Sequence, residues 1–164
     1  MSADMSRATH WSFTQDDADA ITRILLNFLQ ETNSRSALLV DRSGQLVTTV
    51  GEQPQFDATA FATLAAADFS ANDQLAKLIG ETDFTTLFHQ GERDSMYVAD
   101  VARRLILVVL FDQRTTLGLV RLRLKAAVND LNAVFTKPQE TQSADFGASH
   151  LLAGAEDDID RLFS

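Results

Sequence analysis

The stretch Leu105–Phe111, LILVVLF, decides the fold of this chain, because all seven of its residues are apolar. A strand that is apolar on both faces has to be covered on both sides, as the central strands of a sheet are. The stretch is too short to cross a membrane as a helix, which takes about 20 apolar residues. We therefore predict a central β-strand whose sheet carries helices on both faces.

Four further strands are predicted around this one. Thr85–Gln90 and Ser95–Val101 precede it, and the turn sequences GERD and ARR separate the three segments. Earlier in the chain, Ser36–Val40 and Leu46–Val50 flank the sequence DRSG. Gly44 of that sequence can adopt the left-handed conformation that a tight turn needs, so these two segments are expected to form a hairpin.

Three helices are predicted between and beside the strands. Residues 15–32 carry apolar side chains three and four positions apart, and Thr14 opens the sequence TQDD, which is typical of a capping box. A second helix is expected from Asp57, as its N-cap, to residue 78 or 79. A last helix is expected over residues 115–135, with a buried stripe formed by Leu117, Val120, Leu124, Ala127, Val128, Leu131 and Phe135.

The second helix has an unusual distribution of side chains. At about 100° per residue, its predicted apolar face consists of Phe61, Leu64, Ala65, Leu75 and Ile79. Asp68 and Asn72 fall in the middle of this face, so either the helix kinks near DFSAND or these groups meet a partner such as a symmetry mate. Small, weakly polar residues form the opposite face, where they either let another backbone approach or serve helix propensity. They are Thr63, Ala66, Ala67, Ser70 and Gln74.

The domain is expected to span residues 14–135, after a flexible leader at 1–13. Residues 136–155 have the Pro, Gln, Ser, Gly and Ala content of a flexible linker. Residues 156–164, EDDIDRLFS, are expected to form a short amphipathic helix, which is marginal alone in water. Its apolar stripe must therefore meet the chain's own core, a second copy or a partner; the residues concerned are Ile159, Leu162 and Phe163, beside the acidic Asp157, Asp158 and Asp160.

Composition narrows the class of protein. The chain has 164 residues, 45% of them hydrophobic, and a net charge of −9, which disfavours nucleic acid and anionic membranes as partners. The absence of cysteine excludes disulfides and thiolate metal sites, and it suits a reducing compartment. The first residues, MSADMSRATHWSF, lack the apolar segment of a signal peptide. A cytoplasmic protein that does not insert into membranes is therefore expected.

No arrangement typical of catalysis is found in the sequence. His10, His89 and His150 are scattered and lack the spacing of metal ligands. Neither a GxxxxGK[ST] loop nor a GxGxxG sequence is present. His89 lies on a predicted strand without a base, an orienting group or a metal, so a structural role is expected for it. We predict a binding protein rather than an enzyme, with no cofactor and no metal.

One basic group stands out in this acidic chain. Arg114 precedes the last predicted helix, and Arg121, Arg123 and Lys125 lie on it. Such a group is either a solvated helix face or a docking site for a second, acidic protein partner.

The order helix, hairpin, helix, three strands, helix resembles the Roadblock/LC7 family. The resemblance rests on LLVDRSGQLV, LAKLIGETDFTTLFHQGERDSMYV, LILVVLFDQRTTLGLVRLRLKAA and the terminal DDIDRLF, and it covers residues 15–135 and the tail. It implies an α+β three-layer sandwich with a five-stranded antiparallel sheet. The first and last helices would cover one face of that sheet, and the second helix would cover the other.

The resemblance is to a bacterial branch of this family that regulates an MglA-type Ras-like GTPase in cell polarity and motility. It implies a homodimer whose paired second helices form a platform for the GTPase, with stimulation of hydrolysis but no inserted catalytic arginine. It also implies that the C-terminal helix contacts the GTPase and modulates nucleotide exchange. The alternative is a scaffold that binds a GTPase or another protein without stimulating hydrolysis.

Two sets of partner-binding residues are expected on this basis. The platform would be formed by Ala66, Ala67, Ser70, Ala71 and Gln74. The contact made by the C-terminal helix would be formed by Asp157, Asp158, Ile159, Leu162 and Phe163. A further polarity protein would bind, if at all, at the basic group of Arg114, Arg121, Arg123 and Lys125.

Overall fold

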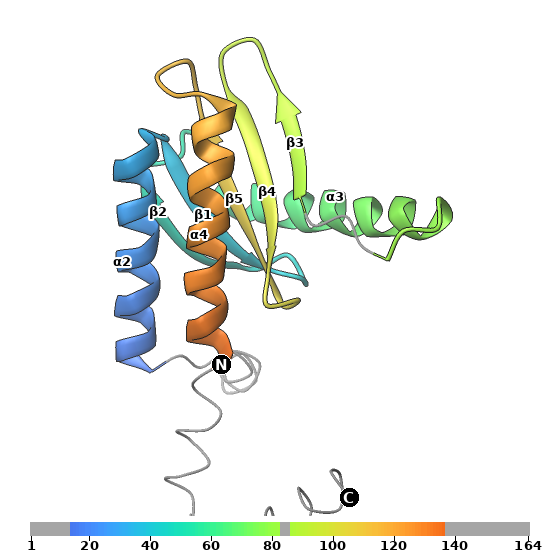
Figure 1. Cartoon of the computed structure of the whole chain (residues 1–164), viewed down its shortest axis with the longest axis horizontal. Helices are drawn as coiled ribbons and strands as arrows, with labels where there is room; N and C mark the ends of the chain where they lie inside the picture. The colour runs from blue at the N-terminus through green and yellow to red at the C-terminus, as the bar shows by residue number, and fades with distance from the viewer. Residues whose placement is uncertain (1–13, 83–85, 137–164) are drawn as a thin grey trace, which may run out of the picture.

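The computed structural model of the chain describes residues 14–82 and 86–136. The elements follow in the order α2 (Gln15–Thr32), β1 (Ser36–Asp41), β2 (Leu46–Gly51), α3 (Ala58–Leu78), β3 (Thr86–Gln90), β4 (Ser95–Val101), β5 (Leu105–Phe111) and α4 (Leu117–Thr136). The strands form one antiparallel sheet in the order β2-β1-β5-β4-β3. Figure 1 shows three layers, with α2 and α4 side by side on one face and α3 on the other.

The predicted fold class is therefore confirmed, and so is the role of LILVVLF. Strand β5 lies in the middle of the sheet, between β1 and β4. Its residues alternate between two cores: Leu107 and Val109 face α2 and α4, whereas Ile106 and Val108 face α3. Because both faces of β5 pack against helices, polar side chains are unfavourable at every position, which explains why the whole strand is apolar.

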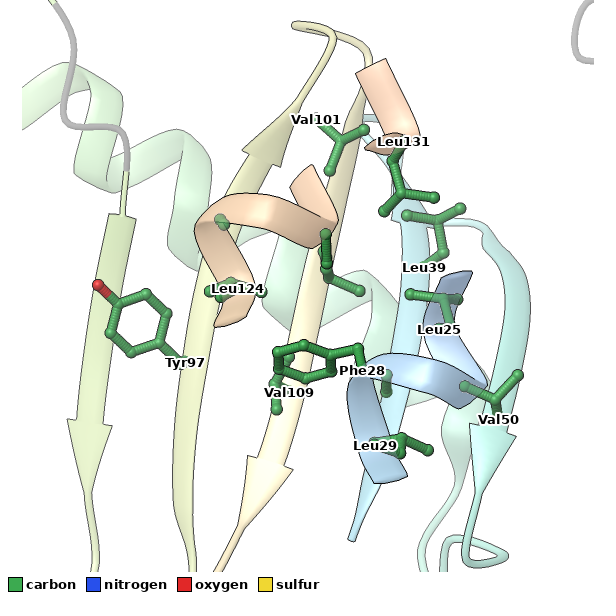
Figure 2. Close-up of a cluster of buried hydrophobic side chains, with 14 of the residues drawn as sticks. Leu25, Phe28, Leu29, Leu39, Val50, Tyr97, Val101, Val109, Leu124 and Leu131 are labelled. Atoms are coloured by element: carbon green, nitrogen blue, oxygen red, sulfur yellow. The ribbon is translucent and has the colours of Figure 1, made fainter. Parts of the chain in front are cut away.

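The core under α2 and α4 is built from large side chains. Figure 2 shows Leu25 and Phe28 of α2 and Leu124 of α4 over the sheet, and all three are at most 2% exposed. Helix α2 begins as predicted with a capping box, in which the Thr14 hydroxyl accepts from the Asp17 backbone N–H at 3.1 Å. This layer follows the ordinary rule that the apolar stripe of a helix faces inward.

The hairpin turn brings α3 close to β1 and β2. Asp41 is buried, and its Oδ1 accepts from the backbone N–H groups of Ser43 (3.0 Å) and Gln45 (2.9 Å). Gly44 has a φ of +97°, and a Cβ at this position would lie 3.1 Å from Cα of Thr63 on α3. Glycine is thus needed both for the turn and for the close approach of the helix.

The structure corrects what the sequence suggested for α3. The helix is continuous from Ala58 to Leu78, so of the two alternatives for Asp68 and Asn72, an interruption of the helix at DFSAND does not occur. The predicted apolar face is only partly buried, because Leu64 is 69% and Leu75 is 57% exposed, whereas Ala65 is 5% exposed. The side that packs on the sheet consists mainly of alanines around Phe69, and the residues of the predicted small-residue face are exposed except for Ala66.

The remaining boundaries agree with the sequence to within one or two residues. The strand predicted from Thr85 is described from Thr86 onward. The leader at 1–13, most of the linker at 136–155 and the terminal segment at 156–164 lie outside the described residues, so their predicted organisation stays a prediction.

Candidate protein-interaction surface

Helix α3 is fixed at both ends by the residues that flank it. The Asp57 carboxylate accepts from the backbone N–H groups of Thr59 (3.0 Å) and Ala60 (3.2 Å), which confirms it as the N-cap. Past the other end, Gly80 adopts a φ of +85° and donates its N–H to the Lys77 carbonyl at 3.2 Å. The helix therefore has a defined start and stop, and its outer face has a fixed orientation.

The inner face of α3 is made almost entirely of small residues. Its buried positions are Ala62, Ala65, Ala66, Phe69, Asn72 and Ala76. Phe69 is the one large apolar side chain among them, and it is fully buried against the sheet. Alanine contacts bring the helix axis close to the sheet and leave the larger apolar residues for the other side.

The outer face of α3 displays these larger side chains to solvent. We use the term leucine stripe for Leu64, Leu75 and Leu78, which are 69%, 57% and 82% exposed. At about 100° per residue they lie within about 60° of one another around the helix. Leu75 and Leu78 are about one turn apart, and Leu64 lies about 16 Å back along the helix. Exposed apolar side chains on one helix face are typical of protein-binding surfaces. Figure 1 shows that the last turns of α3 extend past β3, beyond the edge of the sheet.

Three of the five residues predicted for the platform lie beside this stripe, and Ala71 lies within it, between Leu64 and Leu75 along the helix. Ala67, Ser70, Ala71 and Gln74 are all exposed on the outer side of α3, and we call them the platform surface. Ala66 does not lie with them, because it is only 5% exposed and packs in the core between α3 and the sheet. The surface available to a partner thus combines small polar positions with neighbouring leucines.

The two polar residues of the predicted apolar face have different surroundings. Asp68 has a partner within the chain, because its Oδ2 lies 2.6 Å from Nε2 of His89 on β3. This contact joins β3 to α3, and a structural role for His89 stays a prediction. Asn72 is 7% exposed, and among the described residues its Nδ2 has no hydrogen-bond partner. Only Asn72 therefore retains the unsatisfied character that the sequence suggested.

Arg42 ties α3 to the rest of the molecule. Its guanidinium pairs with Asp73 of α3 at 2.8 Å and also with Asp100 of β4. The same group lies 5.0 Å from the centre of the Phe69 ring. Sequence reasoning missed this contact, because residues of three separate elements meet only in the folded chain.

A second network of charges lies where β1, β2, β4 and β5 end. Arg35 pairs with Glu52 (2.9 Å) and Asp94 (2.8 Å), and Arg114 pairs with Glu52 (3.1 Å) and Asp112 (3.0 Å). Hydrogen bonds from Arg35 and Arg114 hold the pKa of Glu52 below its usual value. The residues line an open hollow of about 770 Å³, but its two paired arginines are already matched by carboxylates. We therefore interpret the network as ion pairs that hold the strand ends together, not as a ligand site.

The predicted basic group separates into two parts. Arg114 belongs to the network just described, and Arg123 lies 3.6 Å from Glu31 of α2. Arg121 and Lys125 are exposed on α4, and neither forms an ion pair within residues 14–82 and 86–136. The two positions free to meet an acidic partner are thus Arg121 and Lys125.

The described part of the chain offers neither a metal site nor a membrane span. No group of three His, Cys, Asp or Glu side chains there could hold a metal ion. None of its helices is long and apolar enough to cross a membrane. His10, His150 and the five predicted contact residues of the C-terminal segment lie outside the described residues.

Comparison with known proteins gives a consistent result. The family model of the Roadblock/LC7 domain matches residues 20–111. The solved structure of Myxococcus xanthus MglB is 42% identical, with a TM-score of 0.68, and the match covers 71% of this chain and 94% of that one. The gliding protein MglB of Thermus thermophilus is 34% identical, with a TM-score of 0.70 and coverage of 74% and 93%. A further structure, described as MglB with a tetrameric arrangement, is 34% identical, with a TM-score of 0.68 and coverage of 75% and 92%.

Proposed function

Because the chain belongs to the Roadblock/LC7 domain family and is similar to MglB, we propose that it is a homodimeric regulator of an MglA-type Ras-like GTPase. In this proposal it accelerates GTP hydrolysis by the GTPase and acts in bacterial cell polarity and motility. It is not itself an enzyme, since the hydrolysing groups belong to the partner.

The outer face of α3 is the observation that carries the proposal. A helix that buries alanines and exposes three leucines is poorly arranged for a monomer, since apolar area left in water contributes nothing to stability. Covering the leucine stripe with the same stripe of a second copy resolves this, because a twofold interface uses one self-complementary patch. The tetrameric arrangement of a similar MglB supports self-association.

The platform surface would then remain open for the GTPase. Ala67, Ser70 and Gln74 lie on the side of α3 next to the leucine stripe and are small or polar. In a twofold dimer the two copies of this surface would adjoin and form one binding face. Small side chains there permit close approach of a partner's backbone, whereas the leucines would be buried in the dimer interface.

Stimulation of hydrolysis would come from rearranging the GTPase. The resemblance implies no inserted arginine, and none is needed on the platform surface, where the four side chains carry no charge. Binding energy would instead be used to align the catalytic groups that the GTPase already has.

The dimer is tested by light scattering at micromolar concentration. We expect a mass of about 36 kDa, twice the 18.0 kDa of the chain. Leu75→Glu with Leu78→Glu should give a folded monomer, while Leu26→Glu on α2, where the leucine is 48% exposed, should leave the dimer intact. A wild-type monomer would rule the dimer out.

Activation is tested with single-turnover GTP hydrolysis by the cognate GTPase. Ala67→Arg with Ser70→Arg should abolish activation, because two bulky charges would occupy the platform surface. Asn27→Arg with Gln30→Arg is the matched control, since it places the same charges at the same spacing on the exposed side of α2. Binding without activation by the wild type would favour the scaffold alternative, and unchanged activation by the platform variant would place the GTPase on another face.

The C-terminal segment is proposed to tune this interaction. Truncation after Phe135 should leave the dimer folded and still active, but affinity and nucleotide release should both change. Leu162→Ala with Phe163→Ala should copy the truncation. Release of a fluorescent GDP analogue from the GTPase measures the effect; identical rates for the full-length and truncated chains would remove the segment from this role.

A further inference from the structure

Helix α4 has an exposed apolar stripe on the side that faces away from the sheet. Leu122 is 66% exposed and Leu119 is 36% exposed, and Ala126 and Ala133 continue the same line towards the end of the helix. At about 100° per residue these four positions lie within about 60° of one another. The stripe is distinct from the buried side of α4, where Val120 and Leu124 meet the core.

Basic side chains border this stripe. Arg121 and Lys125 lie along one flank, both exposed and both without an ion pair in the described residues. Arg123 lies along the other flank and is 49% exposed, at 3.6 Å from Glu31. On this side Asp130 is also exposed next to the stripe, so the cationic flank is the one formed by Arg121 and Lys125. An apolar strip with one cationic flank suits an amphipathic helix that carries acidic residues beside its apolar ones.

The chain carries a segment of that composition at its own end. Ile159, Leu162 and Phe163 have the spacing of one helical stripe, and Asp157, Asp158 and Asp160 lie among them. The three apolar side chains would thus meet an apolar stripe, and the carboxylates would meet Arg121 and Lys125 on its cationic flank.

The length of the intervening chain allows the two to meet. Helix α4 ends at Thr136, and Leu122 lies 14 residues earlier, so the stripe is about 21 Å back along the helix. The 20 residues from 137 to 156 have linker composition, for which the expected root-mean-square reach is about 25 Å. A tether of this length also gives the segment a local concentration on the order of millimolar, so a weak contact is enough to keep it docked.

We propose that the outer stripe of α4 is a docking site for residues 157–163 of the same chain. The segment would lie along Leu119, Leu122 and Ala126, with its carboxylates towards Arg121 and Lys125. The docked segment would be withheld from other partners until one competes for it; that this partner is the GTPase is a consequence that rests on the proposed function.

Because the chain has no cysteine, the contact can be trapped with two introduced thiols. Leu122→Cys with Leu162→Cys should form an intrachain disulfide under mild oxidation at least about tenfold faster than the control pair, because docking raises the local concentration. The control is Leu26→Cys with Leu162→Cys, in which the first thiol is exposed on α2. Mass and mobility on a non-reducing gel separate intrachain from interchain products. Equal rates for the two pairs would overturn the proposal, and a product that is only interchain would assign the site to the tail of a second copy instead.

Charge reversal tests the basic flank in the same assay. Arg121→Glu with Lys125→Glu, added to the Leu122→Cys and Leu162→Cys variant, should slow crosslinking several-fold. Salt at 0.5 M should slow the variant without charge reversal in the same way. Exposed charges are then screened, because the Debye length is already about 10 Å at 0.1 M. Arg23→Glu with Lys77→Glu makes the same change in net charge elsewhere and should have little effect. Equal slowing by both reversals would show that net charge, not this surface, controls the reaction. No GTPase is present in these experiments, so their failure would leave the proposed function standing.

Discussion

The two helical layers of this molecule, on opposite faces of the sheet in Figure 1, bury different side chains. Helices α2 and α4 bury mainly leucine, isoleucine, valine and phenylalanine, whereas α3 buries mainly alanines around the single large residue Phe69. Both layers also expose leucines, and α3 exposes three of them. Both layers cover the same five strands, and both are anchored by the alternating residues of β5. The difference therefore comes from the helices and not from the sheet.

This contrast separates the part of the chain that stabilises the fold from the part that is available for binding. Burial of large side chains dominates stability, so the layer of α2 and α4 should supply most of it. The α3 layer should contribute less to stability, because Leu64, Leu75 and Leu78 are exposed and bury little apolar area. Substitutions in the two layers should accordingly have different consequences.

The largest effect is expected in the layer of α2 and α4. Phe28→Ala removes a side chain that is 2% exposed and central in Figure 2, and it should cost about 3–5 kcal/mol in the free energy of unfolding. Urea denaturation followed by circular dichroism measures it. A loss below about 1 kcal/mol would mean that this layer is not the main source of stability.

Overpacking should be the sensitive change under α3. Ala62 is fully buried where the helix approaches the hairpin, so Ala62→Leu should destabilise the fold by about 1–3 kcal/mol. Ala60→Leu makes the same change at an exposed position of α3 and should stay within about 0.5 kcal/mol of the wild type. If both variants have wild-type stability in thermal unfolding, the contact between α3 and the sheet is looser than its alanines indicate.

Arg42 connects α3 to strand β4 of the sheet, and its removal should have a smaller effect. Arg42→Ala leaves Asp73 and Asp100 without their cation and exposes one face of the Phe69 ring. Because the Arg42 side chain is 35% exposed, we expect a loss of about 1 kcal/mol. Arg23→Ala on α2 serves as the control, and equal unfolding midpoints in urea for the two variants would remove Arg42 from this role.

The smallest effect should come from Glu52 and should depend on pH. Its pKa in the folded chain is lowered by Arg35 and then Arg114, so its ion pairs stabilise the fold above the ordinary glutamate pKa of about 4.3. As the pH falls through the lowered pKa, Glu52 is protonated and this contribution is lost. Glu52→Gln should therefore reduce Tm slightly at pH 6 and narrow the drop in Tm between pH 6 and about pH 3. A drop of the same size in both proteins would show that the network adds nothing measurable.

The sequence correctly predicts which sides of α2 and α4 are buried, because large apolar residues at helical spacing usually pack in the core. The same rule fails for α3. Leu64, Leu75 and Ile79 were placed on the apolar face of the helix, but they are exposed, and the close approach of Thr63 to Gly44 goes with an inner side made mainly of alanines. That distance is a property of the folded chain, and no pattern within α3 reveals it.

The exposure of the residues predicted for the platform was anticipated in part. Ala67, Ser70, Ala71 and Gln74 are exposed, but Ala66 is buried beside them, and their binding role stays a prediction. The exposure of the leucines was missed because apolar residues were taken to mean the core. For Asp68 the sequence left open a kink or a partner such as a symmetry mate, yet His89 of β3 meets it within the chain.

The strand order also has a consequence for how the chain folds. Strands β1 and β2 form one local hairpin, and β3, β4 and β5 form a local meander, but β1 joins β5, with Asp41 opposite Leu105 and Ser36 opposite Leu110. Closing so long a loop costs entropy before any contact compensates for it, so this pairing should come late and limit the folding rate. Until it forms, the strand LILVVLF has one unpaired edge and two apolar faces. During synthesis this strand is therefore the segment of the domain most prone to pair with another chain.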